Sequence, residues 1–69
     1  MNIQEGKQYK TRNGLITSPI EKSTDGTNYI WKATIQDPVY PTPSHLSWRD
    51  DGRFLIPEYD HRYDLIEEL

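Results

Sequence analysis

The sequence predicts an all-β protein, a five- to six-stranded antiparallel meander that curls into a small SH3-like barrel. The main evidence is three glycine turns, at Asn13-Gly14, Asp25-Gly26 and Asp51-Gly52. Asn-Gly and Asp-Gly readily adopt the positive φ angles that tight hairpins require. Between the turns, apolar and polar residues alternate, as is typical of strands. Closure into a barrel is expected because it removes exposed sheet edges.

The first three strands follow these turns in order. Residues 7–12 alternate and are expected to form the first strand. Residues 15–21 suit the second, with an open side or a bulge at Pro19, because proline has no amide to donate to a ladder. The clearest strand is residues 28–36, where one face collects Tyr29, Trp31, Ala33 and Ile35.

The second half of the chain begins with a proline-rich segment. Three prolines in residues 37–44 exclude a helix or an inner strand and predict a stiff, extended surface loop. A short hairpin is expected next, with His45–Trp48 facing Arg53–Ile56, and Pro57 ends it. Residues 63–67 are expected to pair with the first strand and close the barrel, and a short C-terminal helix is the alternative for this end of the chain.

Size and composition predict one domain, residues 1–69, and they also bear on its oligomeric state and its location in the cell. A domain of 69 residues without cysteine has no disulfide to stabilise it, so a homo-oligomer is expected. Its eight aromatic residues supply large apolar side chains for a small core. No apolar run approaches the roughly 20 residues of a membrane span, and the N-terminus lacks the pattern of a signal peptide, which together predict a cytosolic protein with no membrane partner.

Charge is unevenly distributed along the chain. The net charge is −3, yet basic residues outnumber acidic ones in residues 1–35, and acidic residues dominate residues 36–69. The distribution is typical of two differently charged solvent faces. Head-to-tail attraction between subunits, or between the first and last strands, is the alternative.

No catalytic signature is present, so the chain is not expected to be an enzyme. His61 lies in a polar stretch between Asp60 and Asp64 that is typical of a turn, and structural zinc sites need four ligands. The adjacent carboxylates of Asp50 and Asp51 belong to a hairpin tip, where Asp commonly bonds local backbone. Neither a metal nor a cofactor is expected.

The strongest binding pattern surrounds the Asp51-Gly52 turn. Arginine offers a planar fork for phosphate or carboxylate, and aromatic rings can stack on a base. The predicted ligand-binding residues are therefore Trp48, Arg49, Arg53, Tyr40 and His45. In the alternative interpretation, Trp48 and Phe54 belong to the core and both arginines are solvated.

Two other binding modes compete with this one. Basic residues interleaved with aromatics in residues 7–32 are one way in which single-stranded nucleic acid is tracked, but alternation places Lys10 away from Tyr9 and the net charge is acidic, which argues against a nucleic-acid partner. The proline-rich segment, or an exposed sheet edge, can instead dock on another protein.

Three motifs resemble those of a loose group of short bacteriophage-encoded proteins. They are Tyr9-x-Thr11-Arg12-Asn13-Gly14, Trp48-x-x-Asp51-Gly52-Arg53 and Asp64-Leu65-Ile66-x-Glu68. The resemblance implies a phage accessory protein in the host cytoplasm, of a type that often counters host defence. The function first expected is sequestration of a small anionic ligand, and the expected ligand is a host nucleotide immune signal. A protein-binding inhibitor or adaptor of a host or phage protein is the alternative, and a weak nucleic-acid-binding barrel is third.

Overall fold

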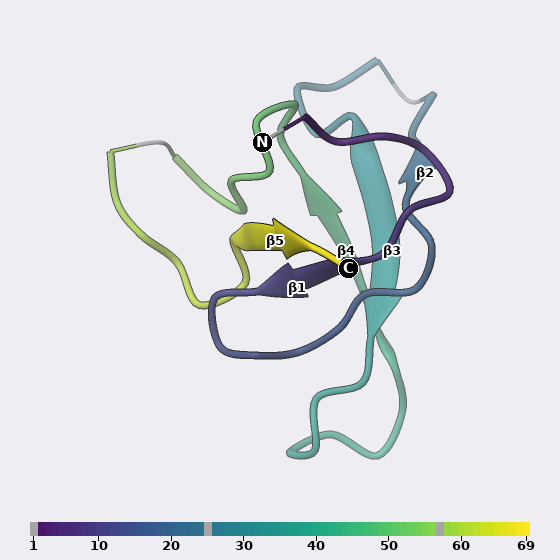
Figure 1. The fold of residues 1–69 in the computed structure, drawn as a ribbon, viewed down its shortest axis with the longest axis vertical. Helices are drawn as coiled ribbons and strands as arrows, with labels where there is room; N and C mark the ends of the chain where they lie inside the picture. The colour runs from purple at the N-terminus through teal and green to yellow at the C-terminus, as the bar shows by residue number, and fades with distance from the viewer. Residues whose placement is uncertain (1, 25, 57) are drawn as a thin grey trace.

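The computed structural model describes residues 2–24, 26–56 and 58–69. These residues form an all-β fold without a helix, as predicted (Figure 1). The strands are β1 (Tyr9–Thr11), β2 (Glu21–Lys22), β3 (Trp31–Ile35), β4 (Ser44–Trp48) and β5 (Leu65–Glu68). Every pairing between them is antiparallel. No described helix is long and apolar enough to cross a membrane.

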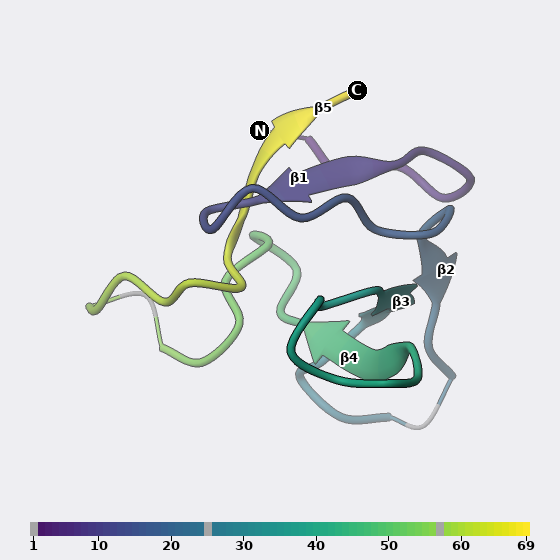
Figure 2. The same cartoon turned by 90° about the horizontal axis from the view of Figure 1, so that it is seen from below.

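The strands form two sheets that lie one above the other (Figure 2). One sheet has the order β1-β5 and the other β2-β3-β4. The segment after the first turn joins them, because Ile16 bridges to Lys10 of β1 and Thr17 bridges to Ile35 of β3. The described strands therefore surround a core on two sides, but they do not form a single closed barrel.

Pairing between the two ends of the chain confirms the predicted contact of first and last strands. Tyr9 is opposite Glu68 and Thr11 is opposite Leu65, with a register shift between Lys10 and Thr11. Residues 65–68 are a strand, so the helical alternative for this segment is wrong.

Two predicted strands differ from those observed. Residues 53–56 form no strand, and β4 pairs along its length with β3 instead. The predicted second strand, 15–21, is not continuous. Within it, residues 16 and 17 form isolated β-bridges, and Glu21 begins β2. The expected end of the hairpin at Pro57 and the middle of the turn at Asp25 lie outside the described residues.

The core lies between the two sheets. Its fully buried apolar side chains come from both of them and from the segment before β2. They are Tyr9, Ile20, Ile35 and Trp48. On the predicted face of residues 28–36, Ala33 and Ile35 are buried and Trp31 packs against the core, whereas Tyr29 precedes β3 and is not part of the core.

Glycine is required at position 52 on two grounds. Its φ of +87° is unfavourable for residues with a side chain. A Cβ there would also lie 3.0 Å from Cδ1 of Ile3 and 3.4 Å from Cβ of Leu65. The turn after β4 thus packs its backbone directly against the start of β5.

Candidate functional site

The five predicted ligand-binding residues do not share one site. Tyr40, His45 and Arg49 line three separate surface hollows. The side chain of Arg53 forms ion pairs with Asp60 and Asp64. The structure therefore brings none of the expected aromatic rings together with Arg49 and Arg53 around a single cavity.

Trp48 belongs to the core, which supports the alternative interpretation of this residue. Its exposed fraction is 0%. The indole Nε1 donates to the carbonyl of Tyr63 at 2.7 Å, and the ring meets Phe54 edge-to-face at 6.4 Å between centroids. Because both faces of the indole are covered, Trp48 has no surface on which a base can stack.

A different feature emerges from the chain after β4. Residues 54–56 and 58–61 belong to a loop region that projects from the body of the molecule, at the left of Figure 1. Both ends of this loop are bound by one carboxylate: Oδ1 of Asp64 accepts the amide of Phe54 at 2.9 Å, and Oδ2 accepts the amide of His61 at 2.8 Å. We call this segment the clamped loop.

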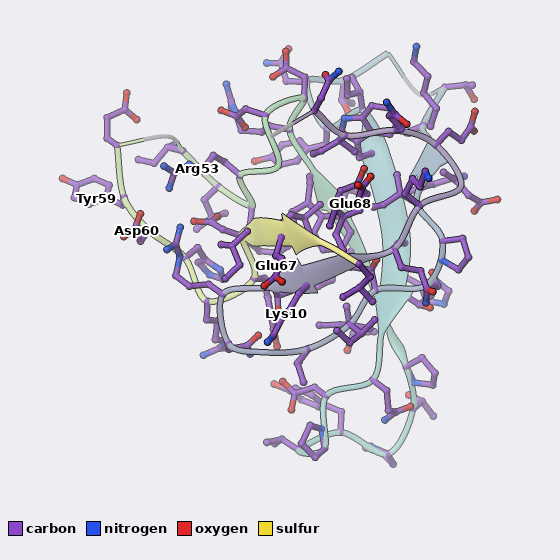
Figure 3. The ribbon with its side chains drawn as sticks, in the orientation of Figure 1. Lys10, Arg53, Tyr59, Asp60, Glu67 and Glu68 are labelled. Carbon is purple, nitrogen blue, oxygen red and sulfur yellow. The ribbon has the colours of Figure 1, made fainter. Side chains whose placement is uncertain are left out.

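Two arginines complete the surroundings of the clamp. Arg12, from the turn after β1, lies 3.3 Å from Oδ2 of Asp64, and Arg53 lies 3.2 Å from the same atom. Both guanidinium groups also pair with Asp60, at 3.4 Å and 2.9 Å. Figure 3 shows the side chain of Arg53 extending outward from the body of the protein toward Asp60 on the projecting loop.

The charge of Asp64 is stabilised although its side chain is almost fully buried. Burial acts to raise its pKa, but hydrogen bonds from the amides of Phe54 and His61, and the nearby Arg12 and Arg53, outweigh burial, so the pKa of Asp64 is lowered. The pKa of Arg53 is raised, chiefly by its hydrogen bond to Asp60. The cluster is therefore a balanced ionic network in which no arginine is left free for an added anion.

Ring stacking also joins the two ends of the clamped loop. The rings of Phe54 and His61 stack with centroids 4.7 Å apart, and Tyr63 meets Phe54 edge-to-face at 5.5 Å. His61 accepts the amide of Tyr63 through Nδ1, at 3.1 Å. Through Trp48, these rings are continuous with the core.

The outer part of the clamped loop exposes large apolar side chains. Leu55 is 47% exposed, Ile56 45% and Tyr59 72%. Figure 3 shows Tyr59 pointing away from the rest of the protein. Residue 57, between them, lies outside the described residues. Tyrosine is enriched among the residues that contribute most to protein interfaces, and exposed apolar side chains that lie together mark interaction sites.

Charges elsewhere do not gather into a basic track. Lys10 is opposite Glu67 in the β1–β5 pairing, and Lys32 is opposite Glu21 in the β2–β3 pairing. Lys10 and Glu67 project from the same region of the two-strand sheet (Figure 3). Among the described residues no group of His, Cys, Asp and Glu has the composition of a metal site.

Sequence reasoning missed the clamped loop because its contacts are non-local. It treated residues 60–64 as a polar turn, and the structure has a turn there. What it missed is that Asp64 is buried and bound by Phe54 and by Arg12, far away in the chain. The available signal was that Arg12, Arg53 and Asp64 belong to the three motifs singled out in the sequence.

Comparison of this chain with protein-family models, curated protein sequences and solved structures finds no match.

Proposed function

We propose that this chain is a non-catalytic protein-binding domain, which docks on its partner through the clamped loop. The resemblance to phage accessory proteins suggests the role of an inhibitor or adaptor acting on a host or phage protein. Leu55, Ile56 and Tyr59 are the contact residues in this proposal. Asp64 and Arg53 act indirectly, by fixing the loop that carries them.

The observation that carries the proposal is the contrast between the base of the loop and its outer part. The base is held by a buried carboxylate, two arginines and a ring stack, as described above. The outer part leaves three large apolar side chains in water. A loop whose two ends are held in place loses less conformational entropy on binding than a loop with free ends, so its exposed apolar groups yield more affinity.

Charge around the loop suggests the chemistry of the partner. Residues 50–60 contain four carboxylates and one arginine, and that arginine is paired within the cluster. Glu58, beside Tyr59, is exposed. The complementary surface is therefore an apolar recess with basic residues at its rim.

The test compares Leu55→Ser and Tyr59→Ser with Val39→Ser. Val39 is 78% exposed on the proline-rich loop and is the matched control for loss of an exposed apolar side chain. The partner is first captured by the wild-type chain from producing cells and then purified for titration. We expect each clamped-loop variant to lose about tenfold or more in affinity, and Val39→Ser to bind as the wild type does. Equal binding by all three variants would refute the proposal.

Sequestration of a small anionic ligand stays as the second candidate, on a different set of residues. A hollow of about 430 Å³ lies between the proline-rich loop and the turn after β1. Its lining includes Tyr40, Arg62 and Asn13, together with Asp37 and Val39. Calorimetric titration with cyclic nucleotides tests this candidate, and loss of the binding heat in Arg62→Ala would assign the ligand to this hollow.

A further inference from the structure

The outer edge of β4 differs from the other strand edges of the molecule. Among the described strands, β4 pairs only with β3, on the side opposite to β2 (Figure 1). β2 carries Glu21 and Lys22, and β5 carries Glu67 and Glu68. β4 has the sequence Ser-His-Leu-Ser-Trp, without Asp, Glu, Lys, Arg or proline. Charged residues and prolines are the usual protection of an edge strand against pairing with another chain.

The register of β3 shows which backbone groups of β4 face outward. Ser18 donates to the carbonyl of Thr34 at 2.8 Å, so the backbone polar groups of Thr34 face away from β4. The direction of the backbone amide and carbonyl alternates from one residue to the next along a strand. Trp31, Ala33 and Ile35 are therefore the residues of β3 whose backbone groups bond to β4. Ala33 is opposite Leu46. His45 and Ser47 therefore direct their amides and carbonyls away from β3.

The turn after β4 agrees with this direction. The amide of Arg49, two residues after Ser47, donates to the carbonyl of Arg53 at 2.9 Å and so points away from β3. Among the described residues, no backbone partner outside the strand pairings is recorded for His45 or Ser47. The free part of the edge is short, bounded by Pro43 on one side and by the Arg49–Arg53 bond on the other.

We propose that this edge pairs with the same edge of a second copy, in antiparallel register about a two-fold axis at Leu46. In this register His45 of one copy exchanges amide and carbonyl hydrogen bonds with Ser47 of the other, and the two sheets become one six-stranded sheet. Leu46 is half-buried and faces its own copy across the axis, which covers its remaining exposed surface. The short, uncharged edge fits a partner that is identical to itself, because no like charges are brought together.

This pairing is independent of the clamped loop. It adds a self-association surface on β4 to a partner-binding surface on residues 54–61. Because only two residues of each copy contribute backbone bonds, the dimer is weak and forms at high protein concentration.

Sedimentation velocity over a concentration series tests the proposal with three substitutions at one position. Ser47→Pro removes the outward amide and leaves the bonds to β3 intact. Ser47→Lys adds a charge to the edge, and Ser47→Ala keeps the amide and is the matched control. We expect a dimer for wild type and Ser47→Ala, and at least about tenfold weaker association for Ser47→Pro and Ser47→Lys.

Amide hydrogen exchange is a second measurement, and a change in its rate with protein concentration reports association and not folding. Exchange at Ser47 is expected to slow as protein concentration rises, while exchange at Leu46 stays unchanged. Circular dichroism establishes that each variant is folded. A wild type that stays monomeric with a fast-exchanging Ser47 amide overturns the proposal, as does a dimer that persists in folded Ser47→Pro. The proposal is also overturned if the wild type is monomeric and the Ser47→Pro variant no longer binds the partner protein, because the edge of β4 would then pair with a strand of that partner.

Discussion

The carboxylate of Asp64 lies 2.9 Å from the amide nitrogen of Phe54, ten positions earlier in the chain. The same carboxylate binds the amide of His61, so one side chain closes the loop between these two residues. A buried carboxylate that accepts backbone amides and pairs with arginines is strongly held. The conformation of the clamped loop, and with it the proposed binding surface, therefore depends on Asp64.

Asp64→Asn is expected to lower the free energy of unfolding by about 2–4 kcal/mol, because it leaves two arginines without their buried partner. Asp60→Asn is the control, since Asp60 pairs with the same arginines but its side chain is 69% exposed. Its cost is expected to stay below about 1 kcal/mol. Urea denaturation measures both values, and equal losses would show that burial of Asp64 is not the deciding factor.

Stability is expected to fall in acid because of Asp64. Its pKa is lowered in the folded state from the ordinary value of 3.8, so the unfolded chain takes up a proton more readily. The contribution of Asp64 is therefore complete above pH 3.8 and is lost as pH falls through the lowered folded pKa. Urea midpoints measured across this range should fall less steeply in Asp64→Asn than in the wild type, and parallel pH profiles would contradict the assignment.

Trp48→Phe tests the position of Trp48 in the core. The substitution removes the indole donor to the carbonyl of Tyr63 and leaves unfilled space beside Phe54. We expect a loss of about 2–3 kcal/mol in the free energy of unfolding. The measurement is thermal or urea unfolding, with Trp31→Phe as the control, because Trp31 is only partly buried. A neutral Trp48→Phe would mean that the indole is not packed as described.

Tyr63→Phe is expected to loosen the proline-rich loop. The phenol of Tyr63 donates to Oδ2 of Asp37 at 3.0 Å, and Oδ1 of Asp37 accepts the amide of Val39 at 2.9 Å. Without the phenol, the buried carboxylate loses a donor, which costs about 1–3 kcal/mol. Faster amide exchange at Val39 in Tyr63→Phe, with unchanged exchange at Phe54, is the specific result expected. Unchanged amide exchange at Val39 would show that the phenol of Tyr63 does not hold the proline-rich loop in place.

The sequence predicted the features that depend on neighbouring residues. Gly14, Gly26 and Gly52 all have positive φ, as the turns require, and Ala33 and Ile35 share the buried face of β3. Features that depend on distant residues were not predictable in the same way. Pairing of β4 with β3 instead of with residues 53–56 is decided by tertiary packing.

The role of Asp64 was hidden for a related reason. Its partners Arg12, Arg53 and Phe54 all lie ten or more positions away in the chain, and local pattern shows only an acidic residue before an apolar strand. For the same reason, the expected ligand site did not assemble. Trp48 and Arg53 are close in sequence, but packing directs the indole into the core and the guanidinium group toward Asp60.

Photo-crosslinking in producing cells tests the central claim most directly. A photoreactive phenylalanine analogue replaces Tyr59 on the clamped loop, or Tyr40 on the proline-rich loop, and the two exposed tyrosines serve as matched positions. We expect a crosslink to one protein from position 59, lost when Leu55→Ser is added, and none to that protein from position 40. A crosslink to the same protein from position 40 alone would contradict it.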